Sequence, residues 1–273
     1  MDMPRKILWV IGRRLYLWSR NELTNDPATN GEYSLLKKIL KNKNDNCEIV
    51  MMDIGANIGE WSNQVLLHLK NNHNANIKVV VFEPAIDTFN TLKGKLSYHD
   101  NVIFNNVLMS NYVGTSDFYI HDKNSKTNSI FIQKGERVSV ESTTIDQYVV
   151  DCNINYIDYI KCDTEGNDLN VILGAEKSLD SGIIAMFQFE YNHRWINAKC
   201  FLKDVFDFID DKNYFLGKIS KSTIEIYQNW HPEMERFFEA NYILINKNQA
   251  EIIATSRFVT FSRRNIVSYD VLN

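Results

Sequence analysis

The stretch YIKCDTEGND, residues 159–168, decides the fold. Apolar residues lead into it as in a buried strand, and apolar residues follow it at helical spacing, so a strand, a short turn and a packed helix meet there. Lys161, Asp163 and Glu165 lie at this junction. A buried polar group without a partner costs about 1–3 kcal/mol, and a buried charge costs more. We therefore expect these three side chains to belong to a site.

Apolar runs alternate with helical patterns from residue 47 onward, as is typical of a parallel sheet with crossover helices. Strands are predicted at 47–55, 77–84, 101–110, 157–166 and 183–191, a helix at 200–211, and the last strands at 214–220 and 241–247. A polar segment before the fourth strand holds candidate antiparallel strands at 117–120, 130–133 and 137–142. No stretch resembles a linker or a repeat, so one domain is expected.

The carboxyl ends of the predicted parallel strands carry an unusual set of residues. They are Asp53, Glu83, Ser110, Asp163 and Glu190, of which four are acidic. Helix capping explains one or two aspartates, but it does not explain the set, because glutamate is a poor N-cap. Ligands of open α/β sheets bind beyond this edge, so the acids indicate a binding site.

The segment DIGANIGEWS, residues 53–62, predicts a turn with Gly55 and Gly59 between the first strand and a helix. A dinucleotide fingerprint would have glycine where Asn57 stands, and no phosphate-loop lysine follows. Glu83 ends the next strand, where a carboxylate can accept hydrogen bonds from both ribose hydroxyls of an adenosine. An acid, a glycine turn without pyrophosphate contacts and a ribose acid together suit S-adenosylmethionine.

Several motifs in one order make the chain resemble a known family. They are DIGANIGEWS, VFEP, TTIDQY, IKCDTEGNDLNVILGA and QFEYNHRW, preceded by DPATNGEYSLL. From about residue 25 to residue 215 the chain resembles the FkbM family of S-adenosylmethionine-dependent methyltransferases. Cys162 departs from the aliphatic residue that is more usual there. The resemblance implies O-methylation, often of sugars in glycans or of natural-product hydroxyls.

The resemblance also implies the fold and the cofactor site. We expect an α/β, class I methyltransferase Rossmann-like sheet, mostly parallel with an antiparallel last strand, with an inserted β segment and an N-terminal helical extension. The extension would cover residues 1–35 and the methyltransferase domain residues 36–273. Cofactor contacts are expected from Asp53, Gly55, Ala56, Asn57, Gly59, Ser62, Glu83, Pro84, Ser110 and Asp163.

Four side chains compete for the general base that a weakly nucleophilic hydroxyl needs. We expect His193 or Glu165 to be the base, while Asp163 and Glu190 orient the cofactor or the acceptor. Lys161 most simply pairs with one of these carboxylates. An alternative is that several of the acids hold a divalent metal through oxygen ligands, but hydrogen bonding explains them equally well, and no metal ligand is assigned.

The expected acceptor is a carbohydrate: a sugar hydroxyl of a glycan, polysaccharide or glycolipid, methylated by in-line transfer. Tyr191, Arg194 and Trp195 are the candidate substrate contacts. The alternatives are the hydroxyl of a small polyketide-type natural product and a metal-assisted O-methyltransferase. Asn57 argues against a nicotinamide-dependent dehydrogenase. Intact acids at four strand ends argue against a non-catalytic docking module.

Composition narrows the range of partners and compartments that we expect for this protein. A formal charge of −4 gives no global basic field, so nucleic acid is not an expected partner. Four scattered cysteines without a CxxC pair favour a reducing compartment, and no apolar run spans a bilayer. We therefore expect a cytoplasmic protein.

The segment RKILWVIGRRLYLWSR, residues 5–20, predicts an amphipathic helix. Our first interpretation is a helix packed on its own domain through Leu8, Ile11, Leu15 and Trp18, because surface helices normally carry such a stripe. The alternative is a helix that contacts the inner face of a membrane or a glycosyltransferase complex, with its arginines outward.

Overall fold

The predicted apolar runs form the centre of a ten-stranded sheet in this computed structural model. The structure describes residues 3–20, 22, 26–41, 48–71, 76–120, 128, 130–131, 135–262 and 267–271. The strand order is β13-β12-β10-β9-β11-β8-β7-β1-β2-β3. The strands are β1 (Glu48–Ile54), β2 (Asn76–Phe82), β3 (Val102–Asn105), β7 (Tyr159–Cys162), β8 (Met186–Tyr191), β9 (Tyr214–Ile219), β10 (Ile224–Tyr227), β11 (Ala240–Asn246), β12 (Arg257–Phe261) and β13 (Val267–Val271).

The five strands β3, β2, β1, β7 and β8 are parallel to one another, so their carboxyl ends share one edge. β11 is antiparallel to both of its neighbours, β8 and β9. This arrangement confirms the predicted class I methyltransferase sheet. β11 is the last of the predicted strands along the chain and is antiparallel as expected, and β10, β12 and β13 extend the sheet beyond β9.

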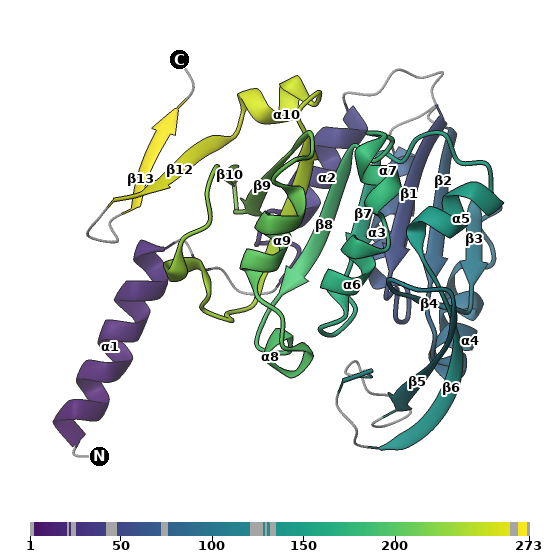
Figure 1. The fold of residues 1–273 in the computed structure, drawn as a ribbon, viewed down its shortest axis with the longest axis horizontal. Helices are drawn as coiled ribbons and strands as arrows, with labels where there is room; N and C mark the ends of the chain where they lie inside the picture. The colour runs from purple at the N-terminus through teal and green to yellow at the C-terminus, as the bar shows by residue number, and fades with distance from the viewer. Residues whose placement is uncertain are drawn as a thin grey trace.

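Helices cover both faces of the sheet, and the alternation of side chains along β1 shows why two cores form. Ile49 and Met51 face one core and Val50, Met52 and Ile54 face the other. α2 (Glu32–Lys41), α3 (Glu60–Asn71), α4 (Ile86–Leu96) and α10 (Ala250–Ala254) pack on the first side, and α5 (Ile145–Asp151), α6 (Asp168–Leu173), α7 (Glu176–Asp180), α8 (Trp195–Ala198) and α9 (Leu202–Ile209) on the second (Figure 1). The predicted domain boundary at residue 35 falls inside α2.

The inserted segment forms a separate three-stranded sheet in the order β4-β6-β5. Its strands are β4 (Leu108–Met109), β5 (Gly114–Ile120) and β6 (Glu136–Thr143), and β5 and β6 are antiparallel as predicted. The single strand predicted at 101–110 is instead divided into β3 and β4. Asn106 breaks it, because its side-chain amide donates to the carbonyl oxygens of Glu83 at 2.8 Å and Pro84 at 3.0 Å. Of the strand predicted at 130–133, residues 132–133 lie outside the described residues, and Ile130 and Phe131 form a bend.

The N-terminal helix α1 (Met3–Ser19) does not pack as we first expected. Leu8, Ile11, Leu15 and Trp18 are all exposed, so the interpretation of a helix packed on its own domain by these residues is wrong. Figure 1 shows α1 projecting away from the sheet, joined to the rest of the chain near the short 3-10 helix η1 (Pro232–Met234) and β12. None of the helices that the structure describes is long and apolar enough to cross a bilayer.

Candidate functional site

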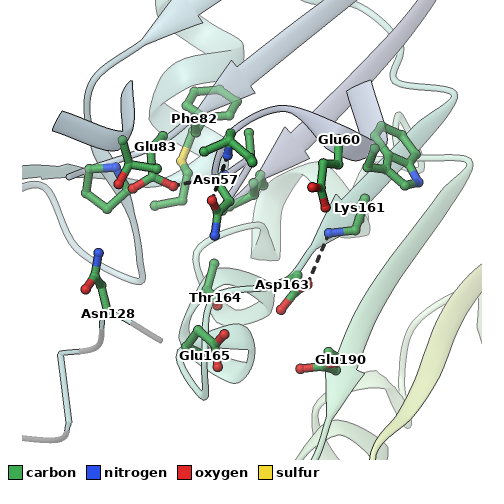
Figure 2. Close-up of a pocket in the computed structure, with 18 of the residues that line it drawn as sticks. Asn57, Glu60, Phe82, Glu83, Asn128, Lys161, Asp163, Thr164, Glu165 and Glu190 are labelled. Atoms are coloured by element: carbon green, nitrogen blue, oxygen red, sulfur yellow. Dashed lines mark hydrogen bonds and ion pairs between the residues drawn. The ribbon is translucent and has the colours of Figure 1, made fainter. Parts of the chain in front are cut away.

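A cavity of about 440 Å³ opens at the carboxyl ends of the parallel strands. Its walls come from the β1–α3 turn, the ends of β2, β7 and β8, the start of α2 and the inserted segment (Figure 2). This volume lies within the range of small-molecule sites, roughly 300–1,000 Å³. The site therefore lies at the edge of the sheet that the sequence predicted.

The β1–α3 turn approaches this cavity with its backbone. Gly55 has φ of +76°, and a Cβ atom there would lie 2.0 Å from the carbonyl oxygen of Asp163, so only glycine fits. The backbone N–H groups of Gly55 and Ala56 both donate to the carbonyl oxygen of Phe82 at 3.0 Å. The turn is thus held by β2 and β7, and these two N–H groups are engaged within the chain.

Glu83 closes the same side of the cavity. One carboxylate oxygen accepts a hydrogen bond from the N–H of Asn57 at 3.0 Å, and the other accepts from the N–H of Ala85 at 2.9 Å. Burial raises the pKa of Glu83 to about 7, although the two N–H groups oppose this shift. Figure 2 shows Glu83 and Asn57 facing each other beside Phe82. Pro84 also lines the cavity.

Lys161 explains why several charged side chains can lie together at the end of β7. Its ammonium nitrogen lies 3.3 Å from Asp163 and 3.9 Å from Asp53, which confirms the predicted pairing with a carboxylate. Burial lowers the pKa of Lys161, but the four acids around it raise the pKa by more, so that the net shift is upward. These acids are Asp163, Asp53, Glu32 and Glu190. The lysine is therefore a fixed cation among four acids.

Asp53 lies beneath the cavity rather than in its lining. It is fully buried, accepts a hydrogen bond from the Ser62 hydroxyl at 2.6 Å and has Lys161 on its other side. Burial raises its pKa against the effect of Lys161. Ser62, Gly59 and Ser110 also lie outside the lining, so four of the predicted cofactor contacts are not part of the cavity wall.

The opposite side of the cavity carries Glu165 and Arg194, whose Oε2 and Nε atoms lie 2.5 Å apart. Glu165 has φ of +56° in the turn after β7. The following Gly166, with φ of +101°, packs against the backbone of Arg194. Burial, followed by Asp163, raises the pKa of Glu165 to about 8, and Arg194 lowers it only in part. A carboxyl of this kind can take up a proton near neutral pH.

The four residues around the end of β8 occupy three different environments. Glu190 lines the cavity, accepts a hydrogen bond from Asn192 at 2.5 Å and has a pKa well above its ordinary value because of burial and Asp163. His193 is exposed and lies outside the lining. Tyr191 and Trp195 are buried in the core: the Tyr191 hydroxyl donates to Glu235, and the Trp195 indole N–H donates to the carbonyl oxygen of Glu190.

Several lining residues were absent from the predicted site, and Glu32 is the most informative. It is buried at the start of α2 and accepts a hydrogen bond from the side chain of Gln188, which also donates to Asn241 at 2.9 Å. The motif DPATNGEYSLL was a signal for it. Trp61 and Thr164 lie within two of the other motifs, whereas nothing local pointed to Asn128, Glu239 or Asn241.

Within the part of the chain that the structure describes, no three His, Cys, Asp or Glu side chains are grouped as metal ligands. The polar side chains that line the cavity include carboxylates, amides, the Lys161 ammonium and the Arg194 guanidinium. They suit a cationic or hydroxylated molecule, because carboxylates accept hydrogen bonds and attract positive charge.

Comparison with known proteins identifies the family of the central segment. A family model described as the methyltransferase FkbM domain matches residues 53–216, more than half of the chain. The match begins at Asp53 and ends within β9, so it includes every element around the cavity except α2 and β11. A search among curated proteins finds no match.

Solved structures with a similar chain trace include several methyltransferases. The METTL16 methyltransferase domain has a TM-score of 0.44 and 9% identity, over 78% of this chain and 65% of that one. TrmK of M. capricolum, solved with S-adenosylhomocysteine, has a TM-score of 0.40 and 14% identity, over 78% and 68%. A precorrin-6y C5,15-methyltransferase of Geobacter metallireducens has 0.39 and 12%, over 78% and 87%. Similarity at these TM-scores does not indicate the acceptor or the reaction of this chain.

Proposed function

This chain belongs to the FkbM methyltransferase family, and on that premise we propose that it transfers a methyl group from S-adenosylmethionine to a hydroxyl oxygen of a carbohydrate. One observation carries the proposal. A single cavity joins Glu83, the carboxylate at the end of β2, to Glu165, a carboxyl whose pKa is raised to about 8. A donor and an acceptor can thus share one space.

The cofactor fits the side of the cavity around Glu83. Phe82, Leu108 and Met109 supply apolar surface there for an adenine ring, and Glu83 supplies a carboxylate for ribose hydroxyls. Asp163 and Glu32 make the middle of the cavity acidic, which favours a positively charged ligand. The cofactor, when bound, supplies a methyl group attached to a sulfonium. The neutral thioether that remains after transfer makes a good leaving group.

The acceptor fits the side around Glu165 and Arg194. A sugar hydroxyl is a weak nucleophile at neutral pH, so removal of its proton by a positioned base adds about 10²–10⁴-fold to the rate. The cofactor would supply the methyl group to the acceptor oxygen, and a Glu165 oxygen would accept the hydroxyl proton. Holding the acceptor oxygen in line with the methyl group contributes up to about 7–11 kcal/mol in well-oriented cases.

Glu165 is a better candidate for the base than His193. Glu165 lines the cavity, whereas His193 is exposed outside it. Glu190 lies in the same wall, but its oxygen is engaged by Asn192, so an orienting role suits it better. Arg194 holds the Glu165 carboxylate and would contact the acceptor, while Tyr191 and Trp195 would act only by packing behind the site.

A carbohydrate is favoured over an apolar natural product because of the groups around the acceptor side. Glu239, Asn241 and Arg194 offer hydrogen-bond donors and acceptors there rather than a hydrophobic wall. Polyols need such pairing, since buried hydroxyls without partners are costly. A polyketide-type hydroxyl remains the alternative acceptor.

Two experiments test the proposal. Calorimetry with S-adenosylhomocysteine and with reduced nicotinamide dinucleotide should give binding of the first alone; the reverse result would overturn the cofactor assignment. Incubation with isotope-labelled S-adenosylmethionine and carbohydrate acceptors, followed by mass spectrometry, should place the label on a sugar oxygen. Label found on carbon or nitrogen would overturn the O-methyl assignment, and label on an apolar hydroxyl would favour the alternative acceptor.

A further inference from the structure

The helix α1 turns its apolar face away from the protein. Ile7, Ile11, Leu15 and Trp18 recur at helical spacing and so share one face, with Leu8 at its side. Their side chains are strongly exposed, reaching 60% for Leu15 and 82% for Trp18. Large apolar residues of a soluble surface helix normally face the core, so this face needs an occupant from outside the chain.

The opposite face of α1 is the one that contacts the body. The guanidinium of Arg13 lies 5.0 Å from the centre of the Phe238 ring, and that of Arg20, just after the helix, lies 4.9 Å from the centre of the Phe261 ring. Tyr16 is hydrogen-bonded to Arg236. Cation–π and hydrogen-bond contacts therefore hold the helix by its polar side and leave its apolar side outward.

The base of the helix is fixed by a buried ion cluster. Glu22 lies 3.1 Å from Lys218 on β9 and 2.5 Å from Arg236, and all three side chains are largely buried. The ammonium of Lys218 also donates to the carbonyl oxygen of Arg20 at 3.4 Å. The outward orientation of the apolar face is therefore tied to the sheet and is not that of a free tail.

The charges of α1 indicate which kind of surface its apolar face would bind. The helix contains Arg5, Lys6, Arg13 and Arg14 and no acidic residue, within a chain of net charge −4. On a helical wheel Arg14 borders the apolar face, Lys6 lies farther round on the same side, and Trp18 lies within the face. Cations beside an apolar face with tryptophan are typical of helices that lie in the headgroup region of an anionic bilayer. A second copy of α1 would bring no acidic residue to pair with these cations.

We propose that α1 docks the protein on an anionic lipid surface, with Ile7, Ile11, Leu15 and Trp18 inserted among the lipids and Lys6 and Arg14 at the headgroups. The helix would lie in the plane of the surface. This inference does not depend on the proposed function, because it uses no residue of the cavity.

Vesicle sedimentation with the full chain tests the proposal. Vesicles of phosphatidylcholine with phosphatidylglycerol should bind the protein about tenfold or more tightly than vesicles of phosphatidylcholine alone, since each cation near an anionic surface raises affinity severalfold. Added salt should weaken that binding. Equal binding to both vesicles, or binding to neither, would overturn the proposal.

Matched variants locate the contact. Ile11→Glu with Leu15→Glu should lower vesicle affinity at least about tenfold, because two apolar insertions are lost and two anions are added. Val150→Glu on α5, at a position that is 70% exposed, is the control and should bind as the wild type does. Melting temperatures of both variants report folding. Sedimentation equilibrium without lipid completes the test. If the wild type is a dimer and the double variant Ile11→Glu, Leu15→Glu is a monomer, the face binds a second copy and the lipid proposal is overturned.

Discussion

The carboxylate of Glu83 accepts a hydrogen bond from the backbone N–H of Asn57 at 3.0 Å, although the two residues belong to different βα connections. Its other oxygen accepts from Ala85 at 2.9 Å. One buried side chain thus joins the turn after β1 to the end of β2 and presents its carboxylate to the cavity. Any ligand that needs the first turn in place also needs Glu83.

Replacement of Glu83 should weaken binding of S-adenosylhomocysteine. In Glu83→Ala the two N–H groups lose their acceptor and the ribose loses its carboxylate, so affinity should fall about 100-fold, which corresponds to ~2.7 kcal/mol. Calorimetry at pH 8 measures the change with the wild-type carboxyl ionised. Glu48→Ala, an exposed change at the other end of β1, is the control and should bind normally. Equal affinities of the two variants would remove Glu83 from the cofactor site.

The same carboxyl predicts a pH dependence of cofactor binding. Burial raises the pKa of Glu83 to about 7, so the group is neutral below that pH and charged above it. A carboxylate accepts two ribose hydrogen bonds better than a carboxylic acid does, because it has no proton of its own to place. Affinity for S-adenosylhomocysteine should therefore rise between pH 6 and 8 in the wild type and rise less in Glu83→Gln.

Gly55→Ala tests the close approach of the first turn to β7. The added Cβ would lie 2.0 Å from the Asp163 carbonyl oxygen, at a backbone φ of +76°, so the turn must move. We expect a loss of about 2–4 kcal/mol in unfolding free energy, together with loss of cofactor binding. Gly94→Ala is the matched control. Its Cβ would meet nothing within 4 Å on α4, and this change should stabilise the protein by about 0.5–1 kcal/mol. Thermal unfolding compares the two.

Local pattern was sufficient for β1, β2, β7 and β8, for the glycine turn and for the acids at these strand ends, because each depends on neighbours in sequence. It could not reveal that the N–H groups of Gly55 and Ala56 are engaged by Phe82, since that contact follows from the pairing of β1 with β2. Glu32, at the start of α2, is held at the cavity by Gln188 on β8, whose side-chain amide donates a hydrogen bond to its carboxylate. Such residues are assigned by tertiary structure alone.

The residues beyond β8 show that a prediction from residue type can also include a residue that tertiary structure places outside the site. His193 was a chemically reasonable base from its type, but the turn after β8 directs it to solvent, whereas Arg194 enters the cavity. Amphipathic spacing in α1 correctly predicted a helix. It could not tell which side would face the protein, because Glu22, Lys218 and Arg236 decide that from another part of the chain.

Removal of Lys161 should be far more costly than removal of an exposed lysine. Lys161→Met leaves Asp53 and Asp163 without their cation, and loss of one partner of a buried ion pair costs about 3–5 kcal/mol. Lys203→Met breaks an exposed pair with Asp207 on α9 and should cost only about 0.3–0.5 kcal/mol. Denaturant unfolding measures both. Similar losses in the two variants would contradict a central electrostatic role for Lys161.

The acids of the site should make stability fall as pH rises. Burial raises the pKa of Glu83 to about 7 and of Glu165 to about 8, and it raises the pKa of Asp168, a buried carboxyl at the start of α6 behind the cavity wall, to about 7. Between the ordinary values near 4 and these raised values, the folded protein holds more protons than the unfolded chain. Its stability is therefore complete at low pH and is lost as pH passes through about 7–8. The melting temperature of the ligand-free protein should drop from pH 5 to pH 8, and Asp168→Asn should reduce that slope.

Turnover of Glu165→Gln against His193→Ala decides the base. Glutamine keeps the size of the side chain but cannot take a proton, so kcat should fall about 10²–10⁴-fold while affinity for S-adenosylhomocysteine is retained. His193→Ala should keep kcat near the wild-type value, because His193 is exposed outside the cavity. The wild-type rate at saturating substrates should rise with pH toward about 8, as the Glu165 carboxyl loses its proton, and a bound sulfonium should shift that midpoint downward. If Glu165→Gln keeps full turnover and His193→Ala loses it, the histidine is the base, and its loop must close over the acceptor during the reaction.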